Sequence, residues 1–319
     1  MTLACSPQRS TTQSPTIQDT TQFSAIQQKL AQDQEEAYRR LGWNMPTYSQ
    51  ADLDARVQRL LEENIAQLTG RPGTTAEYDA HVMEEISGRF HRMREKGLLR
   101  LPTRYEDPRT YLELTILTDQ IETGIKEAFG KDLIPHPVYG TLPTGEVDAS
   151  VIQESGGYLV TFDSGLFKFA DHLSGILALS LPLDGQKKSW FTFSTDRDAI
   201  RRHLDSNPAV VAHLQTIVRA YVVGGAPALT AVPDAPRLRE PFDQMARNLY
   251  RGMLLFVLAH EYGHILTIDQ SLSPGSKLPV QWDREVSADG WGVLLSMVAQ
   301  DGATRNATAA IWGMKVFLV

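Results

Sequence analysis

Two histidines and a glutamate stand within one short stretch, His260-Glu261-Tyr262-Gly263-His264. Side chains four positions apart lie on the same face of a helix, so the imidazoles of His260 and His264 can bind a single metal ion. Glu261 follows the first histidine and therefore points beside the metal, where its carboxylate can take a proton from the attacking water. Zinc lowers the pKa of a bound water from 15.7 to about 7 and polarises the carbonyl under attack. The spacing predicts a zinc-dependent hydrolase, with Zn²⁺ as the cofactor.

A catalytic zinc ion usually has three protein ligands and one open position. The stretch 282–289 offers Glu285 and Asp289, which are four positions apart. If this stretch is helical, both carboxylates face the same side, and we expect Glu285 to be the third zinc ligand. Asp289 is then expected to accept a hydrogen bond from the free ring nitrogen of a zinc-bound histidine. The alternative is that the two carboxylates form a solvated helix face.

The two motifs together resemble the active-site core of the gluzincin metallopeptidases, the thermolysin-like group. The form Glu285-Val-Ser-Ala-Asp289 is most similar to the HtpX-like peptidases and their soluble relatives. This resemblance covers about 242–300 and implies a zincin-like domain in which Glu285 binds zinc and Asp289 braces a histidine. The HtpX-like enzymes have membrane spans, whereas no stretch of this chain reaches the roughly 18–20 apolar residues of a span. The rest of the chain is not assigned to any family.

Two further parts of such a site have several candidates. In zincin folds an edge strand above the motif helix often binds the substrate backbone, and by this resemblance 158–162 or 190–194 could add a peptide as an extra strand. An ordinary half-buried hairpin strand is an equal alternative for 158–162. The oxyanion of the tetrahedral intermediate needs a donor besides zinc. Its candidates are Tyr221, Tyr250, Tyr262, His203 and His213. Tyr262 falls on the opposite side of the helix from His260, which favours a packing role.

Helical spacing of apolar residues dominates the first half of the chain. Residues 1–22 are rich in Ser, Thr and Gln and are expected to be a disordered tail. A helical region is expected over 23–130, with individual helices at 53–68, 76–96 and 107–130.

The second half, 131–319, is expected to form the metallohydrolase domain. Pro and Gly residues in 131–148 predict an irregular connector. The stretches 149–153 and 158–162 flank a turn with two glycines and predict a hairpin in a small antiparallel sheet. Further elements are expected as helices at 165–181, 208–224, 241–268 and 284–300, with a strand at 190–194. The fold class predicted for the whole chain is therefore α+β and mostly helical.

Composition and net charge restrict the binding partners and the cellular location that are expected for the chain. The chain has 319 residues and a net charge of −7, which argues against nucleic acid as the main partner. The resemblance to metallopeptidases implies a peptide or protein substrate. Cys5 is the one cysteine, so no intramolecular disulfide forms, and a cytoplasmic location is expected in the absence of a signal segment. The apolar end at 317–319 has no polar cap, so either the last helix packs against the domain or the native chain continues. The oligomeric state is left open.

Two other functions fit the same residues. A zinc hydrolase could act on a non-peptide amide or ester, because the same attack by water serves any carbonyl. A non-catalytic binding protein could carry a vestigial zinc site, with the N-terminal helices as its working part. The intact Glu261 speaks against this last alternative, since a structural metal site has no use for a general base.

Overall fold

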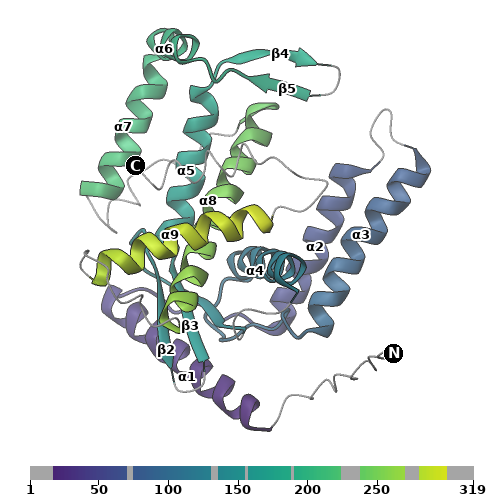
Figure 1. Cartoon of the computed structure of the whole chain (residues 1–319), viewed down its shortest axis with the longest axis vertical. Coiled ribbons are helices and arrows are strands. Elements are labelled where there is room, and N and C mark those ends of the chain that lie inside the picture. Colours follow the sequence, from purple (N-terminus) through teal and green to yellow (C-terminus); the bar gives the residue numbers. More distant parts are fainter. Residues whose placement is uncertain are drawn as a thin grey trace, which may run out of the picture.

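Helices make up most of the described structure, and a small sheet lies beside them (Figure 1). This computed structural model describes residues 17–69, 75–130, 136–154, 157–187, 190–223, 238–269 and 280–299. The helices are α1 (Ile17–Leu41), α2 (Gln50–Leu68), α3 (Ala76–Glu95), α4 (Pro108–Phe129), α5 (Ser164–Ser180), α6 (Arg197–Ser206), α7 (Pro208–Val223), α8 (Phe242–Asp269) and α9 (Val280–Val298). The strands are β1 (Val138–Leu142), β2 (Ala149–Glu154), β3 (Gly157–Asp163), β4 (Leu183–Lys187) and β5 (Trp190–Phe193). The arrangement is consistent with the predicted α+β class.

The N-terminal helices begin and end where the sequence provides caps. Ser49 accepts a hydrogen bond from the backbone N–H of Asp52, whose carboxylate accepts one from the backbone N–H of Ser49, so α2 begins with a capping box. Asp107 caps the first turn of α4, and Pro108 lies in that turn, where a missing N–H costs nothing. The helix ends at Gly130, whose φ of +70° favours glycine.

Helix α1 begins earlier than the sequence predicts. It starts at Ile17, so the expected disorder of 1–22 is wrong for residues 17–22, while residues 1–16 lie outside the described part. The helix packs along β1 and β3 and buries Leu30 against Val138. Because the contacts that hold α1 lie further along the helix, its polar first turn carries no apolar periodicity by which the start could be recognised.

The three-stranded sheet has the order β1-β3-β2. Strands β2 and β3 pair antiparallel, which confirms the predicted hairpin. Strand β1 pairs parallel with β3, so the sheet is mixed and the predicted antiparallel sheet is wrong in this respect. β1 also lies within 131–148, where the sequence predicts an irregular connector. Four of its five residues are buried, so it lacks the alternation of polar and apolar side chains that marks a half-buried strand.

A second, two-stranded sheet joins β4 and β5 in antiparallel pairing. The strand predicted at 190–194 is present as β5. Its partner β4 has the sequence Leu-Asp-Gly-Gln-Lys, which is too polar to indicate a strand. Helix α6 was likewise not predicted from the sequence.

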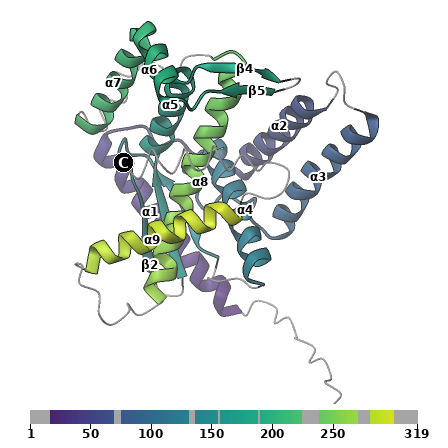
Figure 2. The ribbon, with the colours of Figure 1, turned by 45° about the horizontal axis from the view of Figure 1, so that its top comes forward.

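Helix α8 carries the histidine motif and lies among several neighbours. It packs against α5 and α9 and also contacts α4 and β2. Its stretch 253–259, apolar on all sides, is almost wholly buried as predicted, and Met253, Leu258 and Ala259 have no exposed surface. Figure 2 shows α9 crossing α8. α9 begins at Val280, before the predicted start at residue 284.

One hydrophobic core joins the two halves of the chain. It takes buried residues from α2, α3 and α4 together with others from β3, α5, α8 and α9. The boundary predicted at residue 131 therefore does not separate two cores.

No helix among the described residues combines the length and the apolar character needed to cross a membrane. The apolar C-terminal end of the chain, including 317–319, lies outside the described part. The two interpretations of that end therefore stay predictions.

Candidate metal centre

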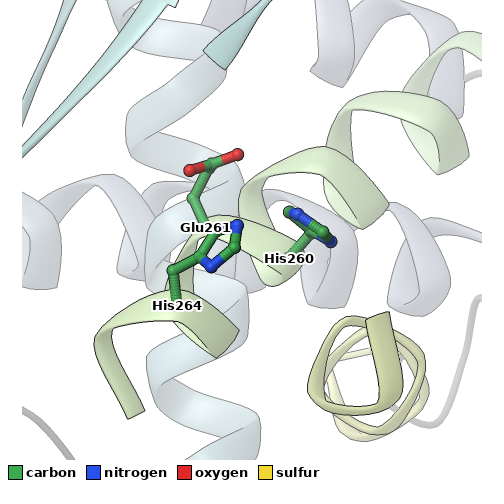
Figure 3. Close-up of side chains that lie close together, drawn as sticks. All are labelled: His260, Glu261 and His264. Carbon is green, nitrogen blue, oxygen red and sulfur yellow. The ribbon is translucent and has the colours of Figure 1, made fainter. Parts of the chain in front are cut away.

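One turn of α8 carries three of the predicted site residues. His260, Glu261 and His264 each offer one ligand atom, and these atoms lie within 4.8 Å of one another. The two imidazole centroids are 4.6 Å apart, and the ring planes are almost perpendicular. Figure 3 shows the three side chains leaving α8 close together. The helical spacing of the motif thus produces the cluster that the sequence analysis expects.

Helix α9 brings Glu285 to this cluster. Oε2 of Glu285 lies 3.4 Å from Nε2 of His260 and 3.5 Å from Nε2 of His264. Ligand bonds of about 2.0–2.2 Å in a tetrahedral zinc site place the ligand atoms roughly 3.4 Å from each other. The two distances from Glu285 to the imidazole nitrogens therefore suit ligands of one zinc ion.

Asp289 contacts the other nitrogen of the first imidazole. Nδ1 of His260 lies 2.9 Å from Oδ1 of Asp289. A carboxylate only accepts hydrogen bonds, so this contact assigns the proton to Nδ1 and leaves the lone pair of Nε2 free to bind a metal. The contact between Asp289 and a histidine of the motif is thus present, and its role beside a metal stays a prediction.

Two glycines allow α8 and α9 to approach so closely. A Cβ atom at Gly263 would lie 2.7 Å from the carbonyl oxygen of Ala288 and 2.9 Å from its Cα. From the other helix, a Cβ atom at Gly292 would lie 3.3 Å from the backbone N and Cα of His260. Backbone therefore packs directly against backbone beside the histidines. The sequence analysis did not assign a role to either glycine, although Gly263 lies inside the motif itself.

Glu261 lies on the buried side of the centre. The residue is 4% exposed, and its Oε2 has no hydrogen-bond partner among the described residues. Burial, together with the charges of Asp148 and Glu285, raises the pKa of Glu261 to about 8. An oxygen that is buried without a partner is costly unless another group uses it. A water molecule or a substrate proton would provide that partner.

The surroundings of the second histidine lower its pKa. Burial lowers the pKa of His264, and the neighbouring His260 lowers it as well. Neutral imidazole is the form that binds metal ions. By contrast, Glu285 is exposed, with 54% of its side-chain surface accessible to solvent. The centre is thus buried on its Glu261 side and open on its Glu285 side.

The candidate oxyanion donors lie elsewhere in the structure. The hydroxyl of Tyr262 is fully buried and donates to Glu122 at 3.0 Å, which confirms its position away from the histidines. The hydroxyl of Tyr250 donates to Glu113 at 2.7 Å. Tyr221 contacts His172, His203 contacts a backbone carbonyl of α5, and His213 lies on α7. Within the described residues, none of the five makes a hydrogen bond, ion pair or ring contact with the metal-centre side chains.

Of the two strands expected to bind a substrate backbone, 158–162 and 190–194, the first is not an edge strand. Because β3 has neighbours on both sides, the prediction that 158–162 acts as an edge strand is wrong. Among the described residues β1 and β2 are the two edge strands of this sheet, and β2 packs against α8. Asp148, which immediately precedes β2, is close enough for its charge to act on Glu261. Sequence patterns could not indicate this, because sheet order depends on the position of β1.

Comparisons with protein-family models, with curated proteins and with solved structures find no match to this chain. The metal centre is therefore interpreted from the geometry of its own residues.

Proposed function

We propose that the chain is a zinc-dependent hydrolase that cleaves peptide bonds, built on a zincin-like domain of the gluzincin type. His260, His264 and Glu285 would hold the zinc ion. Glu261 serves as the general base, and Asp289 orients His260. The sequence resemblance suggests these roles, and the geometry of the described residues supports them.

The observation that carries the proposal is the position of one oxygen atom, Oε2 of Glu285. It comes from a different helix, yet its distances to the Nε2 atoms of His260 and His264 are 3.4 Å and 3.5 Å. Two imidazoles and one carboxylate are a ligand set used by catalytic zinc, which keeps its fourth position open. The exposed side of Glu285 leaves room for such a position.

The remaining residues would supply the proton transfers. When bound, zinc lowers the pKa of water and polarises the carbonyl group that is attacked. The free oxygen of Glu261 accepts the proton of the attacking water, and the same carboxyl group then donates it to the leaving amine. Asp289 holds the proton on Nδ1 of His260, so that Nε2 keeps facing the metal position.

A peptide is favoured over a small amide or ester by the free edge of β2. This strand packs against the motif helix and pairs with β3 along one edge only. An extended peptide can add to such an edge through backbone hydrogen bonds. A small amide would leave this surface unused.

The general base can be tested by changing Glu261 to Gln. We expect this variant to keep about one zinc ion per chain and to lose hydrolysis by a factor on the order of 10²–10⁴, because the amide cannot accept a proton. Zinc content measures the metal centre, and cleavage of a mixed peptide library measures the reaction. Glu127→Gln, the same change at an exposed position of α4, serves as the control and should keep wild-type activity.

Three outcomes would contradict parts of this proposal. Hydrolysis that survives in Glu261→Gln removes Glu261 from its role. Cleavage of small amides or esters but of no peptide favours the alternative hydrolase. Zinc-loaded wild-type protein that cleaves neither class favours a non-catalytic binding protein.

A further inference from the structure

Helix α9 presents a row of apolar side chains to solvent. The row consists of Trp282, Val286, Leu294 and Met297, and we refer to it as the α9 stripe. Trp282 is 66% exposed and Met297 is 63% exposed. At 3.6 residues per turn the four side chains fall within an arc of about 120°, so they lie on one side of the helix.

This concentration of exposed apolar surface is unusual for the described part of the molecule. Twelve large apolar residues are exposed there, and four of them belong to α9 alone, whereas the other eight are spread over six separate parts of the chain. Single exposed apolar residues are normal on protein surfaces. Several on one face mark a surface that binds another molecule.

The stripe begins at the metal centre. Trp282 precedes Glu285 by three positions, so the two side chains are neighbours on the helix surface, roughly 5–6 Å apart at their Cβ atoms. Val286 follows Glu285 directly and is also exposed. Any molecule that reaches the open side of the metal centre therefore passes beside the first two members of the stripe.

The far half of the stripe is apolar and uncharged. The charged residues of α9 all lie at or before Asp289, so Leu294 and Met297 have no charged neighbour on their own helix. From Trp282 to Met297 the helix rises about 22 Å. An extended chain covers about 3.3 Å per residue, so the stripe matches a segment of about six or seven residues. A charged or very short ligand would not use this surface.

We propose that the α9 stripe is a docking surface for an extended apolar segment of a peptide or protein substrate, whose scissile bond lies at the adjoining metal centre. The cleavage step in this inference rests on the proposed function, whereas the binding of the segment to the α9 stripe does not. The substrate class is then an unfolded, apolar segment that extends several residues beyond the scissile bond.

The experiment compares two labelled peptides that share a cleavable sequence taken from library screening. One is extended on both sides by six residues with alternating Leu and Phe, and the other by six residues of Ser and Gly. In the wild-type protein we expect kcat/KM to be at least about tenfold higher for the apolar peptide. The burial of one large apolar side chain is enough for a tenfold difference in kcat/KM. The double variant Leu294→Ser, Met297→Ser should lose this preference, so that its kcat/KM values for the apolar peptide and the Ser/Gly peptide become similar.

A matched control and a binding measurement separate the two proposals. Met83→Ser makes the same change at an exposed methionine of α3 and should keep the preference. Fluorescence anisotropy with zinc-loaded Glu261→Gln protein measures binding without turnover, and the stripe substitutions should weaken binding of the apolar peptide at least tenfold. If this weakening occurs while wild-type protein cleaves nothing, the docking surface stands and the proposed hydrolysis fails.

Two results would overturn the docking proposal. One is equal binding of the apolar peptide to proteins with and without the stripe substitutions. The other is a self-associated wild-type protein that becomes monomeric in the double variant, measured by sedimentation, because the stripe would then be covered by a second copy of the chain.

Discussion

The side chains of the metal centre differ sharply in their surroundings, and this difference suits different tasks. Glu261 is buried with one oxygen lacking a partner among the described residues, whereas Glu285 is half exposed. A ligand on the open side leaves a path for the substrate, while a base on the buried side is shielded from solvent. Two carboxylates near the same pair of imidazoles can therefore take distinct roles.

At Asp289 a single contact can be tested. Asp289→Ala removes the acceptor that holds Nδ1–H of His260, so we expect zinc affinity to fall about 10–100-fold. Competition with a chromophoric zinc chelator measures the affinity. Asp283→Ala removes a carboxylate from the same helix that has no contact with either histidine and should bind zinc as the wild type does. Equal affinities for the two variants would show that Asp289 does not support the centre.

At the scale of elements, the approach of α9 to α8 decides whether a third ligand exists. Neither helix carries all the ligands, and the histidine pair alone leaves two positions open on a tetrahedral ion. The backbone contact between Gly263 and Ala288 sets the distance of Glu285 from the imidazoles. α4 supports α9 from another direction, because a Cβ at Gly124 would lie 2.5 Å from the carbonyl oxygen of Val298.

Gly263→Ala tests this packing. The new methyl group would collide with the backbone of Ala288, so α9 must shift and carry Glu285 away. We expect at least a tenfold loss of zinc affinity, and a loss of about 1–3 kcal/mol in the free energy of unfolding from overpacking. Urea denaturation and chelator competition measure the two effects.

Gly290→Ala is the control for this change. It lies on α9 in open space, so it should leave zinc affinity unchanged and raise stability by up to about 1 kcal/mol through helix propensity. The packing argument fails if Gly263→Ala binds zinc as tightly as Gly290→Ala does.

At the scale of the whole molecule, a buried polar network ties the N-terminal helices to the sheet. The carboxylate of Glu106, just before α4, accepts hydrogen bonds from the backbone N–H and the hydroxyl of Thr141 on β1. It also accepts one from the amide of Gln34 on α1, whose carbonyl oxygen accepts from Thr103. Burial raises the pKa of Glu106 to about 7, even though these hydrogen bonds lower it.

This titration predicts a pH dependence of stability. The pKa of Glu106 in the folded state lies above its ordinary value of 4.5, so between these values the folded protein binds more protons than the unfolded chain does. The contribution of Glu106 to the free energy of unfolding is therefore fully present below about pH 4.5 and is lost above about pH 7. Between these two pH values the free energy of unfolding falls by about 3 kcal/mol. Urea denaturation of the wild type and of Glu106→Gln across pH 4–8 measures it, since other groups cancel in the comparison. A difference between the two proteins that stays constant over this range would contradict the prediction.

The sequence alone determined those features that depend on neighbours along the chain. His260, Glu261 and His264 are grouped by helical spacing, and the hairpin of β2 and β3 follows from alternation and a glycine turn. The caps at Asp107 and Gly130 locate the ends of α4 for the same local reason. Glu285 and Asp289 could be proposed because they stand one turn apart on one predicted helix.

Only the tertiary structure decided which of these local units meet. The parallel pairing of β1 makes β3 central and leaves β2 as the edge beside α8, which no local pattern encodes. Gly263 and Gly292 bring two helices into backbone contact, and the common core joins the helices before residue 131 to those after it. Such contacts depend on the complementary shapes of surfaces far apart in the sequence, whereas periodicity and capping record only the nearest few residues.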